Sequence, residues 1–272
     1  MTIDTAVTAW LSRFERLDVV TSTNDVVAGW LREGTPEVCV AIADMQTAGR
    51  GRDGRTWEAP SGSALLLSVG FRPAWLAPEH AWRLGAIVTM AMAEACEVGA
   101  GARPNSIRLK WPNDMVAIDA PSGAVRKLAG VLGETEGLGT PDARAVIGIG
   151  VNADWKAAAF PPAIAQAITS LAELAPGMNI DREVVTHVFL ERLEPLVEDL
   201  RDGAFPAYAW RARQLTNGVP VRLELPDGSS ETVSAVDVDP ESGALVITEP
   251  GGGPRRSVLV GEIRHLRLGG IL

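Results

Sequence analysis

The residues that could do chemistry gather first in a loop of glycine and arginine at positions 49–56, which reads GRGRDGRT. Glycine leaves backbone N–H groups open to approach, and guanidinium groups pair with phosphate oxygens, so this composition is typical of phosphate binding. The three arginines are Arg50, Arg52 and Arg55, in a chain whose net charge is −9. The loop therefore indicates a local site for an anion, or else a solvated, mobile surface loop.

The same loop matches two phosphate-binding patterns, G-x-G-x-x-G and, with Arg55 in place of lysine, the P-loop. Both patterns require a helix that begins at the loop, so that its N-terminal N–H groups face phosphate. Trp57, Pro60 and Gly62 follow instead, and they do not favour the start of a helix. We therefore interpret both matches as false, while the loop keeps its phosphate-binding composition.

The elements that must position this loop are predicted to be short strands and a few helices. Apolar runs predict strands at residues 17–20, 38–43, 64–71, 107–111, 125–134 and 145–151. Start and stop signals predict helices at residues 25–32, 78–98 and 181–200. The loop then connects the second and third of these strands.

The last part of the chain has a different pattern, with short β-rich runs separated by turn residues. The runs lie at residues 219–225, 232–238, 245–248, 257–260 and 263–268. Five short strands at this spacing suggest a small β-barrel. We therefore expect two domains, a catalytic domain at residues 1–215 and a barrel at residues 216–272.

Composition restricts the class of protein. The chain has 272 residues, of which 46% are hydrophobic and 22% charged, so it can bury a sizeable core. The sequence contains no apolar run long enough to cross a membrane and no secretory signal, so a soluble, cytoplasmic protein is expected. Cys39 and Cys96 lie far apart in apolar surroundings, which favours buried thiols over a disulfide or a metal site.

Five motifs occur in an order that one family shares. They are Ser22-Thr23-Asn24, the segment 46–57 around the loop, Lys110-Trp111-Pro112-Asn113-Asp114, Lys127-Leu128-Ala129-Gly130, and Gly148-Ile149-Gly150-Val151-Asn152. With these motifs the chain resembles the biotin protein ligases, or biotin–acetyl-CoA-carboxylase ligases, over nearly its whole length. The resemblance implies an α+β fold: a mixed β-sheet flanked by helices, like that of class II aminoacyl-tRNA synthetases, followed by a small C-terminal SH3-like β-barrel.

The resemblance also implies a reaction in two steps. ATP, with Mg²⁺, activates the biotin carboxylate to biotinyl-5'-AMP, and the biotinyl group then passes to a lysine of a biotin carboxyl carrier protein domain. Both partners of the first step are anions, so cations and N–H donors must offset their repulsion. The implied catalytic residues are Lys127, Arg52 and Asp114. The sequence suggests no set of metal ligands, so the Mg²⁺ site stays unassigned.

The resemblance assigns the remaining site residues to two ligands. For biotin they are Ser22, Thr23, Asn24, Gln46, Gly49, Arg50, Gly51, Arg52, Lys127 and Gly130. For the nucleotide they are Arg50, Arg52, Arg55, Thr56, Trp57, Asn113, Lys127, Asn152, Thr169 and Ser170.

Several of these residues have a simpler reading. Ser22 and Thr23 can be helix caps only, and without the resemblance that reading is the one to prefer. Trp57 packs by the adenine or merely anchors the loop. Asp114 orients Lys127 or the incoming amine, or else makes an Asx turn beside Pro112.

The chain departs from the family pattern in two places. Residues 119–125 are an insertion between Asp114 and Lys127, so a longer hairpin is expected there. Only 21 residues precede Ser22, which leaves no room for the DNA-binding winged helix of the bifunctional members. The expectation is a monofunctional ligase that binds neither DNA nor membrane.

Two rival functions remain open from the sequence. The first is a related ligase that activates lipoate or another aliphatic acid by the same chemistry. The second is a module that binds nucleic acid or a carrier protein through the arginine loop, but the segment 110–130 would then have no role. Pyrophosphate release with ATP and biotin separates all three.

Overall fold

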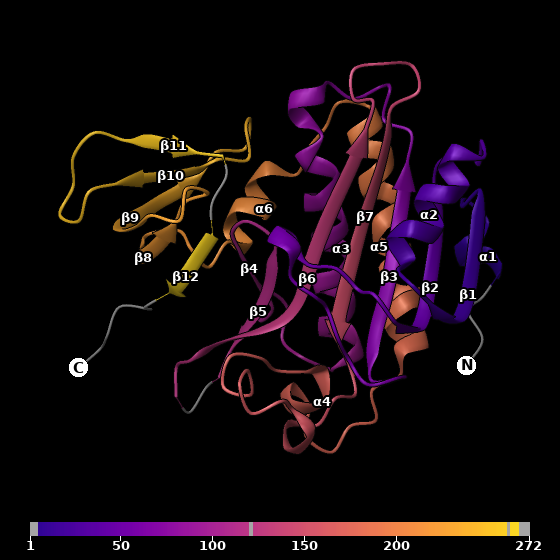
Figure 1. Ribbon diagram of the computed structural model, residues 1–272, viewed down its shortest axis with the longest axis horizontal. Coiled ribbons are helices and arrows are strands. Elements are labelled where there is room, and N and C mark those ends of the chain that lie inside the picture. The colour runs from indigo at the N-terminus through magenta and orange to yellow at the C-terminus, as the bar shows by residue number, and fades with distance from the viewer. Residues whose placement is uncertain (1–4, 120–121, 260–261, 267–272) are drawn as a thin grey trace.

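A seven-stranded mixed sheet forms the centre of the molecule (Figure 1). The structure is a computed structural model and describes residues 5–119, 122–259 and 262–266. The strands of the sheet are β1 (Arg13–Val20), β2 (Cys39–Gln46), β3 (Ala64–Phe71), β4 (Arg108–Lys110), β5 (Asp114–Ile118), β6 (Val125–Glu136) and β7 (Arg144–Asn152). Their order is β1-β2-β3-β7-β6-β5-β4, and only β1 and β2 pair in parallel.

Helices cover both faces of this sheet. They are α1 (Thr5–Thr8), α2 (Thr23–Arg32), α3 (Trp82–Gly99), α4 (Leu171–Leu174), α5 (Arg182–Arg201) and α6 (Ala207–Arg213), with 3₁₀ turns η1 (Arg52–Gly54), η2 (Pro78–His80) and η3 (Ala157–Ala159). Val40 and Ile42 of β2 face the main core with α3 and α5, while Cys39 and Ala41 face α2. Alternate residues of a strand point to opposite faces, so the continuous apolar runs in the sequence correspond to a sheet buried on both sides.

The strands predicted from apolar runs are confirmed, with shifted ends in most cases, whereas strand β5 and helices α1, α4 and α6 were not predicted. A strand, β5, begins at Asp114 itself, where a turn was expected. The helix predicted at residues 78–98 is a 3₁₀ turn followed by α3, because Pro78 starts the turn and the α-helix begins only at Trp82. The insertion at 119–125 lies between β5 and β6, and residues 120–121 of it are outside the described residues.

A second sheet follows α6 and contains the five predicted C-terminal strands. They are β8 (Val219–Glu224), β9 (Ser230–Val238), β10 (Leu245–Thr248), β11 (Arg256–Val258) and β12 (Glu262–Leu266), all antiparallel and in the order β11-β10-β9-β8-β12. Within the described residues this sheet is open, with β11 and β12 as its two edges, so the barrel closure expected from the strand spacing is not seen there.

The two sheets meet through the turn between β9 and β10. Trp111 donates its indole N–H to the carbonyl of Gly243, with an N···O distance of 3.1 Å, and Arg83 donates to the carbonyl of Pro240 at 3.2 Å. Gly243 has φ +72°, and a Cβ there would lie 2.7 Å from the ring of Trp82. Glycine is therefore required both by the backbone and by the close approach of the indole.

A buried ion pair joins α3 to α6. Arg213 donates from Nη1 to Glu97 Oε1 at 2.8 Å and to the carbonyl of Ile107 at 2.9 Å, and the same carboxylate accepts from the Ile107 N–H at 2.9 Å. Both charged side chains are 5% exposed. The pair thus fixes α6 against the start of β4, next to the Lys110–Asp114 motif.

The prediction of two buried thiols is confirmed. Burial raises the pKa of Cys39 from 9.0 to about 11 and raises the pKa of Cys96 as well. Across the described ranges, the helices are too short or too polar to span a bilayer.

Candidate active site

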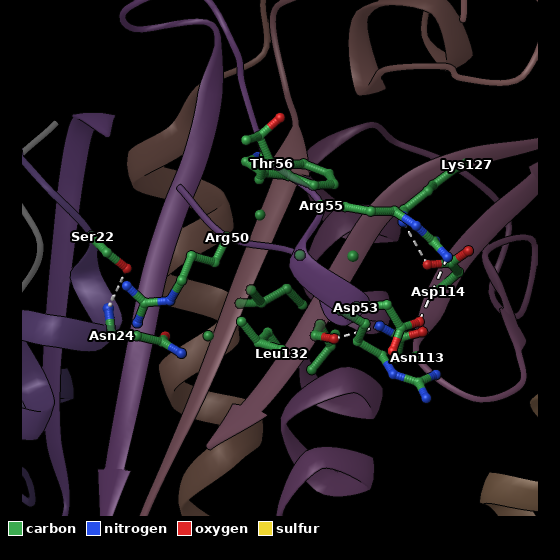
Figure 2. A pocket seen from close by; sticks show the side chains of 18 of the residues that line it. Ser22, Asn24, Arg50, Asp53, Arg55, Thr56, Asn113, Asp114, Lys127 and Leu132 are labelled. Atoms are coloured by element: carbon green, nitrogen blue, oxygen red, sulfur yellow. Dashed lines mark hydrogen bonds and ion pairs between the residues drawn. The ribbon is translucent and has the colours of Figure 1, made fainter. Parts of the chain in front are cut away.

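A cavity of about 110 Å³ lies where β6, β7, the start of α2 and the glycine-arginine loop converge. Most of the predicted site residues line it (Figure 2). They are Ser22, Thr23, Asn24, Gln46, Arg50, Gly51, Arg52, Arg55, Thr56, Trp57, Asn113, Asp114, Lys127 and Gly130. Segments far apart in the sequence are thus brought to one site.

One end of the cavity carries a lysine and an aspartate in contact. Lys127 Nζ lies 2.6 Å from Asp114 Oδ1, and Lys110 Nζ lies 3.9 Å from Asp114 Oδ2. Figure 2 shows Lys127 and Asp114 pointing toward one another from neighbouring strands. Asp114 is 17% exposed and Lys127 34%, so the pair is reached from the cavity and only partly by solvent. Of the two readings of Asp114, this contact favours the one in which the carboxylate orients Lys127.

The backbone of Lys127 is fixed by a second segment. Its N–H donates to the carbonyl of Ala167 at 2.8 Å, and its own carbonyl accepts from the N–H of Thr169 at 2.9 Å. The indole of Trp57 lies on the other side of the amine, with Nζ 5.6 Å from the ring centroid. This distance is within the range of a cation–π attraction between the amine and the indole.

The other end of the cavity is a cluster of buried hydroxyl and amide groups. Ser22 caps α2 by accepting from the N–H of Asn24 at 3.3 Å, which leaves its hydroxyl proton available to another acceptor. Thr23 donates from its N–H and its hydroxyl to Gln46 Oε1, at 2.8 and 3.0 Å. The helix-cap reading of Ser22 is correct, and it does not prevent a further contact with a ligand.

The loop that covers the cavity is folded tightly on itself. Trp57 donates its N–H to the carbonyl of Gly49 at 2.9 Å, and Gly51 donates to the carbonyl of Arg55 at 2.7 Å. The ring of Trp57 lies against Gly150, where a Cβ would be 2.5 Å from Cε2. A single 3₁₀ turn, η1, lies inside the loop, and the next helical turn along the chain is η2. The rejection of the P-loop and dinucleotide patterns is confirmed.

The comparisons with known proteins agree with this geometry. The model of the biotin/lipoate A/B protein ligase family matches residues 17–152. The biotin–[acetyl-CoA-carboxylase] ligase of Mycobacterium tuberculosis is 34% identical over 263 residues, covering 94% of this chain and 91% of that protein. The chain belongs to the biotin/lipoate A/B protein ligase family.

Two further comparisons, one of sequence and one of structure, extend the match of this ligase-family chain. The bifunctional ligase/repressor BirA of Salmonella typhimurium is 32% identical over 86% of this chain and 69% of that protein. The biotin protein ligase from Aquifex aeolicus, solved in complex with biotin and ATP, superimposes with a TM-score of 0.74 at 26% identity over 94% of this chain and 98% of that one. The mixed sheet flanked by helices is therefore confirmed.

Some predicted residues of this family member lie outside the cavity wall. Asn152 is buried and donates from Nδ2 to the carbonyl of Thr169 at 2.9 Å, and Ser170 caps α4 by accepting from the N–H of Glu173 at 3.3 Å. Gly49 lies under Trp57, whose carbonyl oxygen a Cβ would strike. These contacts are structural, and a role of these residues toward the nucleotide or biotin stays a prediction.

Ser68 belongs to the buried polar end, and sequence reasoning missed it. Its hydroxyl lies 2.6 Å from Asn24 Oδ1 and 2.7 Å from Thr23 Oγ1. The signal was a single hydroxyl inside the otherwise apolar run of β3, all of whose residues are buried. A buried polar group needs a partner, so such a residue indicates a polar neighbour on the element packed against the strand, here α2.

A larger groove adjoins the ligase cavity. Its volume is about 1010 Å³, and it shares with the cavity the loop residues 50–53, 55 and 56 and the motif 110–114. Ser242 and Gly243 of the second sheet line its far side. No group of three His, Cys, Asp or Glu side chains among the described residues is arranged to hold a metal ion.

Proposed function

We propose that this chain is a biotin protein ligase, which converts biotin and ATP to biotinyl-5'-AMP and then transfers the biotinyl group to a lysine of a biotin carboxyl carrier protein domain. One observation carries the proposal: the Lys127–Asp114 pair and the buried polar end share one cavity under the arginine loop. The family match and the relatives named as biotin–[acetyl-CoA-carboxylase] ligases support it.

The buried polar end fits the ureido ring of biotin. That ring presents one carbonyl and two N–H groups, so it requires both donors and acceptors. Ser22 and Thr23 offer hydroxyl groups, and Gln46 offers an amide. Leu67 and Ile149 in the same wall provide apolar surface for the rest of the ligand.

The Lys127 end fits the first chemical step. A carboxylate oxygen of biotin forms a bond to the α-phosphorus of ATP, and the bond to the bridging oxygen breaks, so that pyrophosphate leaves with its electron pair. Negative charge accumulates on the phosphoryl oxygens, where Lys127 and Arg52 stabilise it. Mg²⁺ enters with ATP as the metal–nucleotide substrate.

The second step brings the lysine amine of the carrier to the acyl carbon of the mixed anhydride. The lysine nitrogen of the carrier attacks the mixed anhydride, AMP leaves, and the nitrogen loses a proton. Asp114, already in contact with Lys127, is placed to orient the incoming amine. The closed loop meanwhile keeps water from the anhydride.

The proposal extends to the rest of the molecule. The first sheet corresponds to a class II aminoacyl-tRNA synthetase-like catalytic domain at residues 1–215, and the second sheet to the SH3-like barrel of the family. The partner is the carrier domain of acetyl-CoA carboxylase or a related carboxylase in the cytoplasm. DNA is not a partner, because a net charge of −9 repels a polyanion.

Pyrophosphate release tests the function. Purified protein is given ATP with biotin, lipoate or octanoate, and then a carrier domain whose mass is followed. We expect release with biotin and one added biotinyl group on one lysine. Release with lipoate in place of biotin would assign the chain to the other branch of its family. Absence of release with any acid would exclude a ligase.

A further inference from the structure

Four polar side chains at the buried polar end of the cavity form a continuous row of oxygen atoms. Ser68 Oγ lies 2.6 Å from Asn24 Oδ1 and 2.7 Å from Thr23 Oγ1. At the other end of the row, Thr23 Oγ1 lies 3.0 Å from Gln46 Oε1. Ser68, Thr23 and Asn24 are all buried. Each of the three distances is that of an O–H···O hydrogen bond, so each contact needs one proton.

The two amides at the ends of this row supply no proton to it. Glu134 accepts from the amide nitrogen of Asn24 at 2.7 Å, and a carboxylate only accepts, so the amide oxygen of Asn24 must face Ser68. At the other end, the backbone N–H of Thr23 donates to Gln46 at 2.8 Å. The atom of Gln46 that faces Thr23 is therefore also the amide oxygen. Only the hydroxyl groups of Ser68 and Thr23 remain as donors within the row.

The row thus has two protons for three contacts. Ser68 donates to Asn24, its nearest neighbour, and the Thr23 hydroxyl then donates either to Gln46 or to Ser68. In either arrangement one pair of oxygens is left in contact with no hydrogen between them, which is unfavourable for buried groups. Thr23 and Gln46 both line the cavity, so a ligand can reach that pair, whereas Ser68 is fully buried.

We infer that Ser68 is a positioning residue, which accepts the hydroxyl proton of Thr23 when a ring N–H of the ligand donates to Gln46. The ligand then supplies the missing proton, so that three protons serve three contacts. Ser68 passes the polarity on by donating to Asn24, which Glu134 holds in one orientation. An oxygen atom at the same place in the ring brings no proton, so the row selects an N–H there. This inference rests on the proposed function, which gives the ligand as biotin.

Binding of biotin and of two ring analogues tests the inference. The analogues are the two cyclic carbamates in which one or the other ring N–H of biotin is replaced by oxygen, and calorimetry without ATP gives each Kd. The unaltered protein should bind one of the carbamates about a hundredfold more weakly than biotin. In Ser68→Ala the Thr23 proton is left with Gln46 as its partner and competes with the ring N–H. Biotin should then bind about tenfold more weakly and that carbamate less than about twofold more weakly, so their ratio falls.

Three further variants separate this role from a general effect on the fold. Ser63→Ala is the matched control and should leave the ratio unchanged, because Ser63 is a buried serine directly before β3 that donates to the carbonyl of Pro60 at 2.7 Å and lines neither the cavity nor the groove. Thr23→Val removes the hydroxyl, so adding Ser68→Ala to it should not change the ratio further. Ser68→Cys keeps a weakly accepting group of similar size and should give an intermediate ratio, even if the alanine variant does not fold.

The outcomes distinguish this inference from the proposed function. Equal weakening of biotin and both carbamates in the Ser68 variants would overturn the inference, as would an unaltered protein that binds both carbamates as tightly as biotin. Either result can occur in a protein that ligates biotin. The expected fall in the ratio, in a protein that releases no pyrophosphate, would leave the inference standing and reject only the ligase function. A protein that does not bind biotin would reject both.

Discussion

At the scale of single residues, the groups suited to bind the biotin ring lie at one end of the cavity, and the pair Lys127–Asp114, suited to the reaction, lies at the other. Among the groups suited to a ureido ring, Ser22 and Thr23 are buried, and each is fixed by a hydrogen bond within the protein. Lys127, by contrast, is balanced by Asp114 at 2.6 Å and faces the cavity from a strand whose backbone a second segment fixes. A lysine held in this way keeps its position when its charge is shared with a substrate.

We expect Lys127→Ala to slow pyrophosphate release by about a hundredfold to a thousandfold, because charge stabilisation that grows toward the transition state is lost. Biotin affinity, measured by calorimetry, should change little, since Ser22, Thr23 and Gln46 hold the ring. Equal losses in rate and affinity would instead make Lys127 a ground-state binding residue.

Arg52→Gly should leave the fold intact, because the residue lies in η1 of a loop rich in glycine. It should weaken retention of biotinyl-5'-AMP by about 1.5 to 3 kcal/mol through loss of a charge-assisted contact. The measurement is the rate at which the intermediate escapes and biotinylates unrelated proteins. Arg103→Gly is the control, an exposed loop arginine that lines neither cavity; equal leakage from both variants would refute the role.

At the scale of elements, the sequence predicts what depends on local pattern and misses what depends on distant contacts. The apolar run at Ala64–Phe71 gives β3 without error. Helix α6 was missed because its buried side chains, Trp210 and Arg213, depend on Trp82 and Glu97, more than a hundred residues away in the chain. The motif residues that line the cavity were predicted from the family resemblance, which also depends on short local segments.

The missed members of the site follow the same rule. Glu134 and Asp25 read as ordinary solvated carboxylates, and only the tertiary fold shows that they face Arg50. Asp114 lies beside Lys127 because the pairing of β5 and β6 contains a bulge between Met115 and Val116. No pattern in the sequence predicts this bulge. The chemistry of the site was thus predictable, while its positioning partners were not.

The buried pair between α3 and α6 gives a prediction about stability. Glu97→Gln should lower the free energy of unfolding by about 3 kcal/mol, because the buried charge of Arg213 would then be balanced only by the half-exposed carboxylate of Glu94, 3.8 Å away. Urea unfolding measures the change. Glu191→Gln on α5 is the control: that carboxylate is 48% exposed beside His187, and its loss should cost less than about 1 kcal/mol. Similar costs for the two variants would contradict the prediction.

At the scale of the whole molecule, the two sheets pack together through one cluster of aromatic side chains. Trp82 lies 4.8 Å from Trp210 and 5.1 Å from Phe205 between ring centroids, and the turn at Gly243 closes on the same indole. The main core includes residues of both sheets. The groove that adjoins the cavity is therefore walled by both, although the boundary at residue 215 stays a prediction.

The two cysteine thiols lie on opposite faces of the first sheet, so their reactivity measures how tightly each face is packed. Cys39 faces α2 and Cys96 lies in the main core. Near pH 8, a rise in pKa from 9.0 to about 11 lowers the thiolate fraction of Cys39 about a hundredfold, before any loss of access. We expect a thiol reagent to label neither cysteine in the native protein and both in a single step as urea unfolds it. Rapid labelling of either one in native buffer would show local opening on that face.

Because both native thiols are buried and expected to be unreactive, a single cysteine introduced elsewhere can be labelled selectively with a fluorescent dye. A cysteine introduced at exposed Glu58, directly after the loop, would be the one position that a maleimide dye reaches, with no native residue removed. Emission from that fluorophore would follow the loop in real time, molecule by molecule, with and without biotin.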